Sequence, residues 1–379
     1  MRFSILLLLS ALGCVAIACI WDRDTLAAEA KGLPEVVRVV TGRFDRNPAL
    51  YYEMRASRVE EHISREPRRF DLYDDLAVAY DRLGESDKAI EWMERKEQVL
   101  KEAPDGVPGK KDALYKFYAN IGTFYAHRWI RDSGDLEQPG DLEAAQAALT
   151  KAIEINPDAH FGREVFQLWA IEWLLDAETE DTLGEWIGDR LHHRRTEVQE
   201  AIEGISGLIV LGNAWESVDI FQALAYLLGN DHATLAHIAS LRIQELLESG
   251  RKPLKHAESD IVESIHIAMT DEDILRNAEQ EFRRLRAEAE RYHERRTEFM
   301  VARLREGRHP DTDPRFWEGW VEPEPPEIHD ASLIVRARQY SSEMAGVALV
   351  VGILAILAIG VILLRRALLT IVGGWRRDH

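Results

Sequence analysis

The stretch YDDLAVAYDRLGESDKAIEWM, residues 73–93, predicts a pair of helices joined by a turn. Aromatic, apolar and small residues recur at steps of three and four before Gly84 and again after it. This spacing places them on one face of each helix, as in amphipathic helices that pack on a neighbour. Gly84 suits the turn, because glycine adopts positive φ at a helix end without strain. The small residues Ala77 and Ala89 lie where the two helices would touch.

A second unit with the same spacing follows. It consists of YANIGTFY, residues 118–125, and AAQAALTKAIEINP, residues 144–157. Both units resemble the tetratricopeptide repeat, a family whose unit of about 34 residues is a pair of antiparallel helices. The packing positions that carry the resemblance are Tyr73, Leu76, Ala77, Tyr80, Gly84, Ala89, Met93, Tyr118, Ile121, Gly122, Tyr125, Ala145, Leu149, Ala152 and Pro157. The resemblance implies stacked hairpins with a concave surface that commonly binds proteins or peptides.

The second unit departs from the family pattern at its turn. Between Tyr125 and Ala145 it is eleven residues too long. HRWIRDSGDLEQPGD, residues 127–141, is therefore predicted to be an extended helix end followed by a loop. Helical periodicity that matches the repeat only loosely continues at residues 51–64, 161–175 and 220–250.

These patterns predict an all-α chain. We expect a TPR-like helical-hairpin solenoid, a C-terminal capping or coiled-coil-like helix, and one C-terminal transmembrane helix. The predicted segments are a signal peptide or uncleaved anchor at 1–30, a degenerate half-repeat at 31–69, TPR-like repeats at 70–250, a helical cap at 251–306, a stalk at 307–343, a membrane span at 344–364 and a cytoplasmic tail at 365–379.

The segment 271–306 is a long charged helix in this prediction. Its apolar residues follow steps of three and four from Leu275 to Phe299, with Arg296 as the one break. Such a stripe packs on the end of a solenoid as a cap, or forms a short coiled-coil seam that would join two copies of the chain. Both alternatives remain open from the sequence.

Residues 307–343 are acidic and rich in proline, which predicts an extended stalk leading to the membrane. The motif FWEGW within it contains Trp317 and Trp320. These tryptophans either pack back on the solenoid end or dock against a partner, and the sequence favours neither.

The first thirty residues predict export. Arg2 precedes an uncharged apolar run that leads to the small residues of LAAEA, as in a secretory signal. The run is also close to the length of an uncleaved anchor. Both cysteines, Cys14 and Cys19, lie within it, and VAIAC loosely resembles a lipidation site at Cys19.

Residues 344–364 predict a transmembrane helix, because twenty-one residues without a charge span about 30 Å as a helix. Arg365 and Arg366 follow directly, so the basic flank should stay in the cytoplasm and the large domain outside it, on the periplasmic side of an inner membrane. Ala348 and Gly352 form a small-xxx-small pair, which is a second candidate route to a homodimer.

The composition limits the chemistry of the exported part. Residues 31–343 lack cysteine, which excludes disulfides, zinc thiolate sites and cysteine nucleophiles there, and they have a formal net charge of −21. Such a surface repels nucleic acid and favours basic partners, although acidity can also serve solubility alone. The sequence has no HExxH or GxSxG motif, and PDGVPGKKD, residues 104–112, lacks the spacing of a phosphate-binding loop. We therefore predict no catalytic residue, no metal site and no cofactor.

The resemblance also predicts where a ligand would bind. The family's inner-face positions fall on Asp71, Asp74, Asp75, Lys116, Asn120 and Thr123. Three aspartates oppose the capture of acidic tails, so the predicted groove suits basic segments of other proteins. The alternative is that these acids are simply solvated.

Three functions remain open from the sequence. The leading one is a membrane-anchored, non-enzymatic scaffold that organises other proteins outside the cytoplasm. The second is a sensor that signals through its transmembrane helix, although the tail of fifteen residues contains no recognisable domain. The third, an enzyme built on helical hairpins, has the least support.

Overall fold

The computed structural model describes residues 36–132, 134–157, 163–191, 195–212, 214–229, 232–264 and 272–326. Within these ranges the regular elements are all helices, and no strand occurs among them. The described part of the chain therefore agrees with the predicted all-α class. The predicted signal segment, membrane span and cytoplasmic tail lie outside these ranges.

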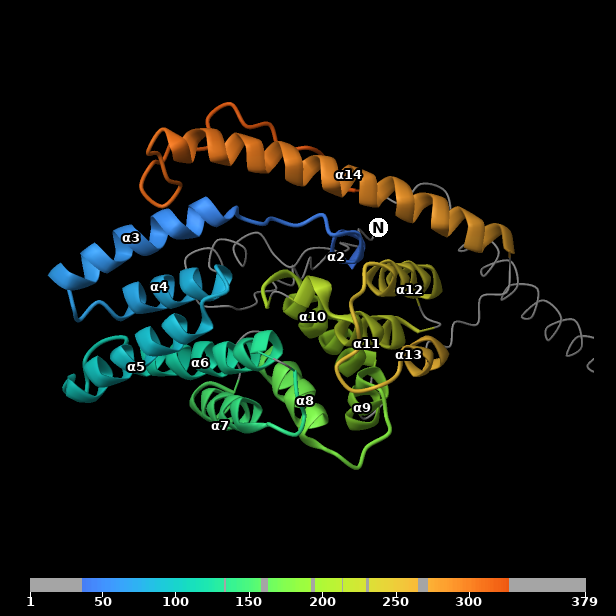
Figure 1. Cartoon of the computed structure of the whole chain (residues 1–379), viewed down its shortest axis with the longest axis horizontal. Helices are drawn as coiled ribbons and strands as arrows, with labels where there is room; N and C mark the ends of the chain where they lie inside the picture. The colour runs from blue at the N-terminus through green and yellow to red at the C-terminus, as the bar shows by residue number, and fades with distance from the viewer. Residues whose placement is uncertain are drawn as a thin grey trace, which may run out of the picture. The chain divides into compact units, whose positions relative to one another are not determined.

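The first half is a series of antiparallel helices, each packed on the next (Figure 1). Their bounds are α3 Ala49–Arg65, α4 Phe70–Arg82, α5 Ser86–Glu102, α6 Lys110–Asp132, α7 Gly140–Ile155 and α8 Arg163–Leu175. The predicted extended helix end is confirmed, because α6 continues to Asp132 and a loop connects it to α7.

Most of the predicted packing positions of the first hairpin are buried. Leu76, Ala77, Ala89 and Met93 each have an exposed fraction of 0%. Gly84 lies in the turn between α4 and α5 with φ at +84°, a conformation that other residues rarely adopt. The local pattern of small and large residues thus decides how α4 and α5 pack.

Gly122 shows why the second hairpin also needs a small residue. A Cβ atom at this position would lie 2.9 Å from Leu149 Cγ and 3.2 Å from the carbonyl O of Ala145. Real Cβ atoms are essentially never this close to a neighbouring side chain, so α6 and α7 can approach each other only because residue 122 is glycine.

The second half continues with less regular helices. These are α9 Leu183–Arg190, α10 Arg195–Val210, the 3-10 helix η2 Ala214–Glu216, α11 Val218–Leu228, α12 Ala233–Glu248 and α13 Glu258–Ser264. α11 lies at the centre of this half and contacts α9, α10 and α12. The predicted helices at 161–175 and 220–250 are confirmed, with a turn at Gly229 in the latter.

The long helix α14, Glu272–Arg305, packs on both ends of the series. It contacts α12 near the C-terminal end of the solenoid, α3 at its start, and the short α2, Val36–Thr41 (Figure 1). Its apolar stripe is buried in these contacts: Ala278, Leu285 and Ala289 have exposed fractions of 0%. The predicted helix is confirmed. Its stripe packs within the chain and therefore does not offer a free coiled-coil seam for a homodimer.

Arg296, the break in that stripe, is also buried, with an exposed fraction of 6%. Its guanidinium donates to the carbonyl O of Arg46 and to Asn47 Oδ1. The charge is buried because the irregular chain before α3 supplies oxygen acceptors for it.

Residues 307–326 do not form the predicted extended stalk. They turn back after α14 and run along it. Arg303 Nε donates to the carbonyl O of Phe316 (2.6 Å), and Arg43 Nη2 donates to the carbonyl O of Pro323 (3.3 Å). The aromatic rings of this segment find apolar and cationic partners on α14, and this gain outweighs the preference of a proline-rich chain for extension. We call residues 307–326 the return segment.

The described helices include none that is long and apolar enough to cross a membrane. The predicted span, residues 344–364, lies outside the described residues and stays a prediction.

Candidate functional site

The predicted groove residues lie on the two helices that the repeat pattern assigned to them. Asp71, Asp74 and Asp75 are on α4, and the other three are on α6. Asp74 and Asp75 have exposed fractions of only 3% and 5%, and Asn120 of 3%. These three residues therefore do not line an open groove in the folded chain, in contrast to the prediction.

Asp74 is held in a buried ion pair. Its carboxylate oxygens lie 2.6 and 2.7 Å from Lys96 Nζ on α5, and Asn120 Nδ2 donates to Oδ1 from α6 at 3.0 Å. The side chain of Lys96 has an exposed fraction of 0%. Burying both charges is tolerated because each supplies the other's counter-ion. Asp74 and Asn120 thus join three helices and are not available to a ligand.

Lys96, the buried counter-ion of Asp74, was not among the residues predicted from the sequence. It lies three residues after Met93 and four before Leu100, both of which are buried in the core. The sequence does contain a signal for this ion pair: a lysine on the apolar stripe of an amphipathic helix predicts a buried acidic partner, because an unpaired lysine would not be buried there.

The remaining predicted residues are also engaged. Asp71 is exposed and pairs with Arg69 (2.6 Å), and Lys116 pairs with Asp112 one turn earlier on α6 (2.9 Å). Thr123 Oγ1 accepts from Gln167 Nε2 of α8 at 3.0 Å. Of the six residues, only Asp71 is exposed.

The C-terminal ends of α4 and α6 are covered by the turn that follows α10. His127 Nε2 lies 3.1 Å from the carbonyl O of Gly212, and Nδ1 lies 2.8 Å from Asp81 Oδ2. Arg82 donates to the carbonyl O of Leu211. These contacts join the C-terminal ends of α4 and α6 to the protein's own second half.

Asp81 is the anchor of this contact. Burial raises the pKa of its carboxyl, but His127 and Arg131 outweigh that effect and lower the pKa to about 2. Arg131 Nη1 lies 2.9 Å from Asp81 Oδ1, and Arg131 Nη2 donates to the Asp81 carbonyl O. The carboxylate stays charged at neutral pH and joins α4, α6 and the turn after α10.

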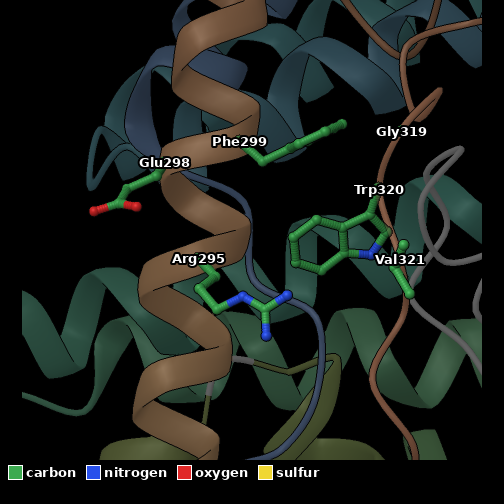
Figure 2. A pocket seen from close by; sticks show the side chains of 6 residues that line it. All are labelled: Arg295, Glu298, Phe299, Gly319, Trp320 and Val321. Atoms are coloured by element: carbon green, nitrogen blue, oxygen red, sulfur yellow. The ribbon is translucent and has the colours of Figure 1, made fainter.

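An exposed set of aromatic side chains lies where the return segment meets α14. We call Phe299, Trp317, Trp320 and Val321 the aromatic surface. The exposed fractions of Trp317 and Val321 are 36% and 74%. Phe299, Trp320 and Val321 line a shallow pocket of about 360 Å³ together with Arg295, Glu298 and Gly319, and in Figure 2 the Trp320 indole lies beside α14 near Arg295 and Phe299.

The aromatic surface is ordered by its own contacts. Phe299 and Trp317 stack with 5.8 Å between ring centres and 4° between their planes. Trp320 lies 5.3 Å from Phe299, and its Nε1 donates to Glu322 Oε2 at 2.8 Å. Both tryptophans thus pack back on α14, which was one of the two open alternatives, while the edge of the surface stays accessible.

The repeats are also found by comparison with known families. The sequence profile described as tetratricopeptide repeat matches residues 70–95 and 136–159. The chain thus contains tetratricopeptide repeats. The first match covers α4 and most of α5, which form the first predicted unit. The second covers α7 with the loop before it, which is the second half of the second predicted unit.

The remaining comparison and the search for metal sites add little to the family assignment. No curated protein gives a significant match to the chain. Within the described ranges, no group of histidine, cysteine, aspartate and glutamate side chains could hold a metal ion. Tetratricopeptide repeats generally bind other proteins, so these repeats suggest a scaffold for protein–protein interactions.

Proposed function

We propose that the protein is a non-enzymatic, membrane-anchored scaffold that binds other proteins on the extracytoplasmic side of the membrane. The match to tetratricopeptide repeats supports the scaffold. The apolar segment at 344–364, with Arg365 and Arg366 after it, supports the anchor and its orientation.

The aromatic surface is the observation that carries the choice of binding site. Of the residues predicted to bind a ligand on α4 and α6, Asp74, Asp75 and Asn120 are buried and the others contact side chains of the protein itself. The aromatic surface instead combines exposed apolar area with three nearby guanidinium groups. Arg303 Cζ lies 4.1 Å from the Phe299 ring centre, Arg296 Cζ 5.0 Å from Trp317, and Arg295 Cζ 5.9 Å from Trp320.

Tryptophan and arginine dominate the energetics of protein interfaces, because they combine large apolar area with directed polar contacts. The stacked rings are held in place before binding, which reduces the entropy lost on association. The partner's contact is therefore an apolar side chain that fits the shallow pocket.

A charge placed on the aromatic surface should abolish partner capture. The substitution Val321→Asp adds a carboxylate at a side chain that is 74% exposed, so the fold should be unaffected while desolvation of the charge opposes docking. Crosslinking in the protein's own cells, followed by identification of the captured proteins, measures the effect. We expect at least a tenfold loss of the main partner.

Ile130→Asp is the matched control, because Ile130 is 49% exposed and lies on α6, away from the return segment. This variant should capture the same partners as the unmodified protein. Equal recovery with Val321→Asp would move the binding site away from the aromatic surface, without contradicting the scaffold itself.

The proposed orientation makes a separate prediction. Proteinase added to intact spheroplasts should digest residues 36–326, while a tag placed after His379 stays protected, because the arginines after residue 364 hold that flank in the cytoplasm. Immunoblotting against the domain and the tag measures both. Detergent lysis is the control and should expose the tag. A domain that survives in intact spheroplasts would contradict the orientation.

A further inference from the structure

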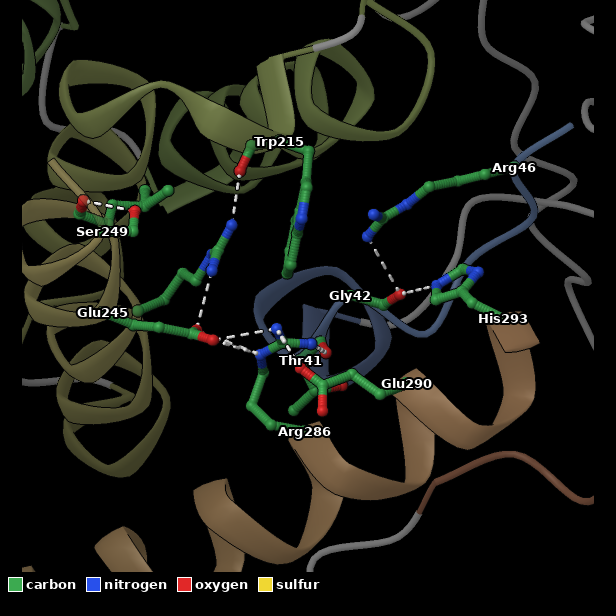
Figure 3. A network of polar contacts seen from close by, with 11 residues as sticks. Thr41, Gly42, Arg46, Trp215, Glu245, Ser249, Arg286, Glu290 and His293 are labelled. Atoms are coloured by element: carbon green, nitrogen blue, oxygen red, sulfur yellow. Dashed lines mark hydrogen bonds and ion pairs between the residues drawn. The ribbon is translucent and has the colours of Figure 1, made fainter. Parts of the chain in front are cut away.

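Three arginines surround the indole of Trp215 in the second half of the protein. The Cζ atoms of Arg242, Arg46 and Arg286 lie 3.9, 4.6 and 5.3 Å from the centre of the Trp215 ring. They come from α12, from the chain before α3, and from α14. Figure 3 shows Arg46 and Arg286 approaching the segment at Thr41 and Gly42 from different sides.

Two of these arginines have carboxylate partners. Glu245 Oε2 lies 2.7 Å from Arg242 Nη1, and Glu245 Oε1 lies 2.9 Å from Arg286 Nη2. Glu290, whose side chain is 62% exposed, lies 3.2 Å from the same Arg286 atom. Glu245 therefore serves two cations, and Glu290 contributes only from the surface.

Arg46 has no such partner within the described part of the chain. Its single hydrogen bond there is a long one of 3.4 Å, from Nη2 to the carbonyl O of Gly42. Its Nε is buried and has no hydrogen-bond partner, although the guanidinium lies over the rings of Phe44 and Trp215. Stacking on aromatic rings compensates a buried cation only in part, because it leaves the N–H donors unsatisfied.

The surroundings make the charge of Arg46 costly. Burial is the largest cause that lowers its pKa, to about 10, and the positive charges of Arg286 and Arg242 add to it. Glu216 acts in the opposite direction but more weakly. An anion beside Arg46 would therefore relieve both the unsatisfied donors and the repulsion between the arginines.

A pocket of about 370 Å³ is open beside Arg46. Besides Arg46 it is lined by Asn47, Pro48, Arg286, Glu290, His293, Glu294 and Thr297. His293 Nε2 lies 2.7 Å from the Gly42 carbonyl O, and burial lowers the pKa of His293 to about 4, so the ring is neutral at pH 7 and donates from Nε2. The charges around the pocket are thus those of Arg46 and Arg286 and of the two glutamates at its rim.

We propose that this pocket binds the carboxylate of a small organic acid, with Arg46 as the group that holds it. The planar guanidinium matches the geometry of a carboxylate and can donate to both of its oxygens. One cation without an anionic partner fits an anion of single charge. Glu290 and Glu294 would repel a dianion such as phosphate more strongly than a monoanion.

Binding at this place would tie together parts of the chain that are distant in sequence. Arg46 precedes α3, whereas Arg286 and Thr297 lie on α14, which closes the solenoid. A ligand that binds only when these parts are assembled stabilises the folded state in proportion to its occupancy. Thermal stability is therefore a direct readout of the site.

The experiment uses the full chain in a mild detergent at pH 7, with sodium acetate titrated against sodium chloride at equal ionic strength. We expect acetate to raise Tm by a few degrees with saturation in the millimolar range. Inorganic phosphate should raise it less. A Tm that does not respond to acetate, or that responds more strongly to phosphate, would overturn the proposal.

Three variants sharpen the test. Arg46→Gln should abolish the acetate response. Glu290→Gln should strengthen it several-fold, because a rim charge that repels the ligand and competes for Arg286 is removed. Arg283→Gln, at a side chain 76% exposed on the same helix, should leave the response unchanged. If Arg46→Gln fails to fold, Glu290→Gln still tests the proposal. An unchanged or weaker rise of Tm with acetate in that variant would contradict the site.

Discussion

Asp74→Asn is expected to lower the free energy of unfolding by about 3–5 kcal/mol, because breaking one side of a buried ion pair leaves the other charge without a counter-ion. Lys96 has a side-chain exposed fraction of 0%, and both of its short contacts, 2.6 and 2.7 Å, go to Asp74. The neutral amide keeps the shape of the side chain but removes the charge. Urea denaturation followed by circular dichroism measures the loss.

The matched control is Asp71→Asn, which lies one turn earlier on the same helix. Its ion pair with Arg69 is exposed on both sides, so removing it should change stability little. The double variant Asp74→Leu/Lys96→Met removes both charges and should recover most of the stability lost in the single variant. If Asp74→Asn instead folded as stably as the unmodified protein, Asp74 would not be the buried counter-ion of Lys96.

The second large effect is expected for Asp311→Asn in the return segment. Asp311 accepts from Arg55 Nε at 2.9 Å and from Arg55 Nη2 at 2.8 Å, and it also contacts Arg58. The Arg55 side chain has an exposed fraction of 0% and that of Asp311 is 3%. Loss of the carboxylate should cost about 3–5 kcal/mol for the same reason as above.

The two predictions differ in where the structure should open. Asp311 holds residues 307–326 against α3, so in Asp311→Asn the segment should detach and become open to tryptic cleavage after Arg308 and Arg315. Limited proteolysis with mass spectrometry would detect the new cleavage sites. Glu318→Gln, an exposed side chain in the same segment, is the control and should leave the digestion pattern unchanged. Equal protection in both variants would mean that the ring contacts alone hold the segment.

The ionisation of Asp311 determines the pH at which Asp311→Asn and the unmodified protein should be compared. Burial raises the pKa of its carboxyl, but Arg55, His309 and Arg58 outweigh burial and lower the pKa to about 2, below the usual value of 3.8. A depressed carboxyl pKa contributes stability that is fully present above the unfolded value and is lost as pH falls through the folded value. A comparison at pH 7 therefore captures the full contribution of the charge.

The helical hairpins could be predicted from the sequence because their information is local. The spacing of Leu76, Ala77 and Ala89 indicates which helix faces are apolar and where two helices must approach closely. Only the period of the α-helix is needed to place these residues on a common face. Gly122 likewise indicates a close approach between two helices that are near in sequence. The family profile matches parts of the same two units. The extra residues after Tyr125 predicted the long α6 for the same reason.

The candidate site could not be predicted in the same way. The repeat pattern placed Asp74 on the inner face of α4, but it could not say what covers that face. The partners of Asp74 lie 22 and 46 residues away, and Asp311 pairs with Arg55 across 256 residues. The pocket at Arg46 is likewise formed by the chain before α3 together with α14.

The amino-acid sequence alone was enough to predict the helices, their hairpins and the repeats, because helical periodicity is a property of neighbouring residues. Which charges are buried and which surface stays open depends on the tertiary packing. The cost of burying a charge depends on the partner that meets it, and that partner comes from a distant part of the chain.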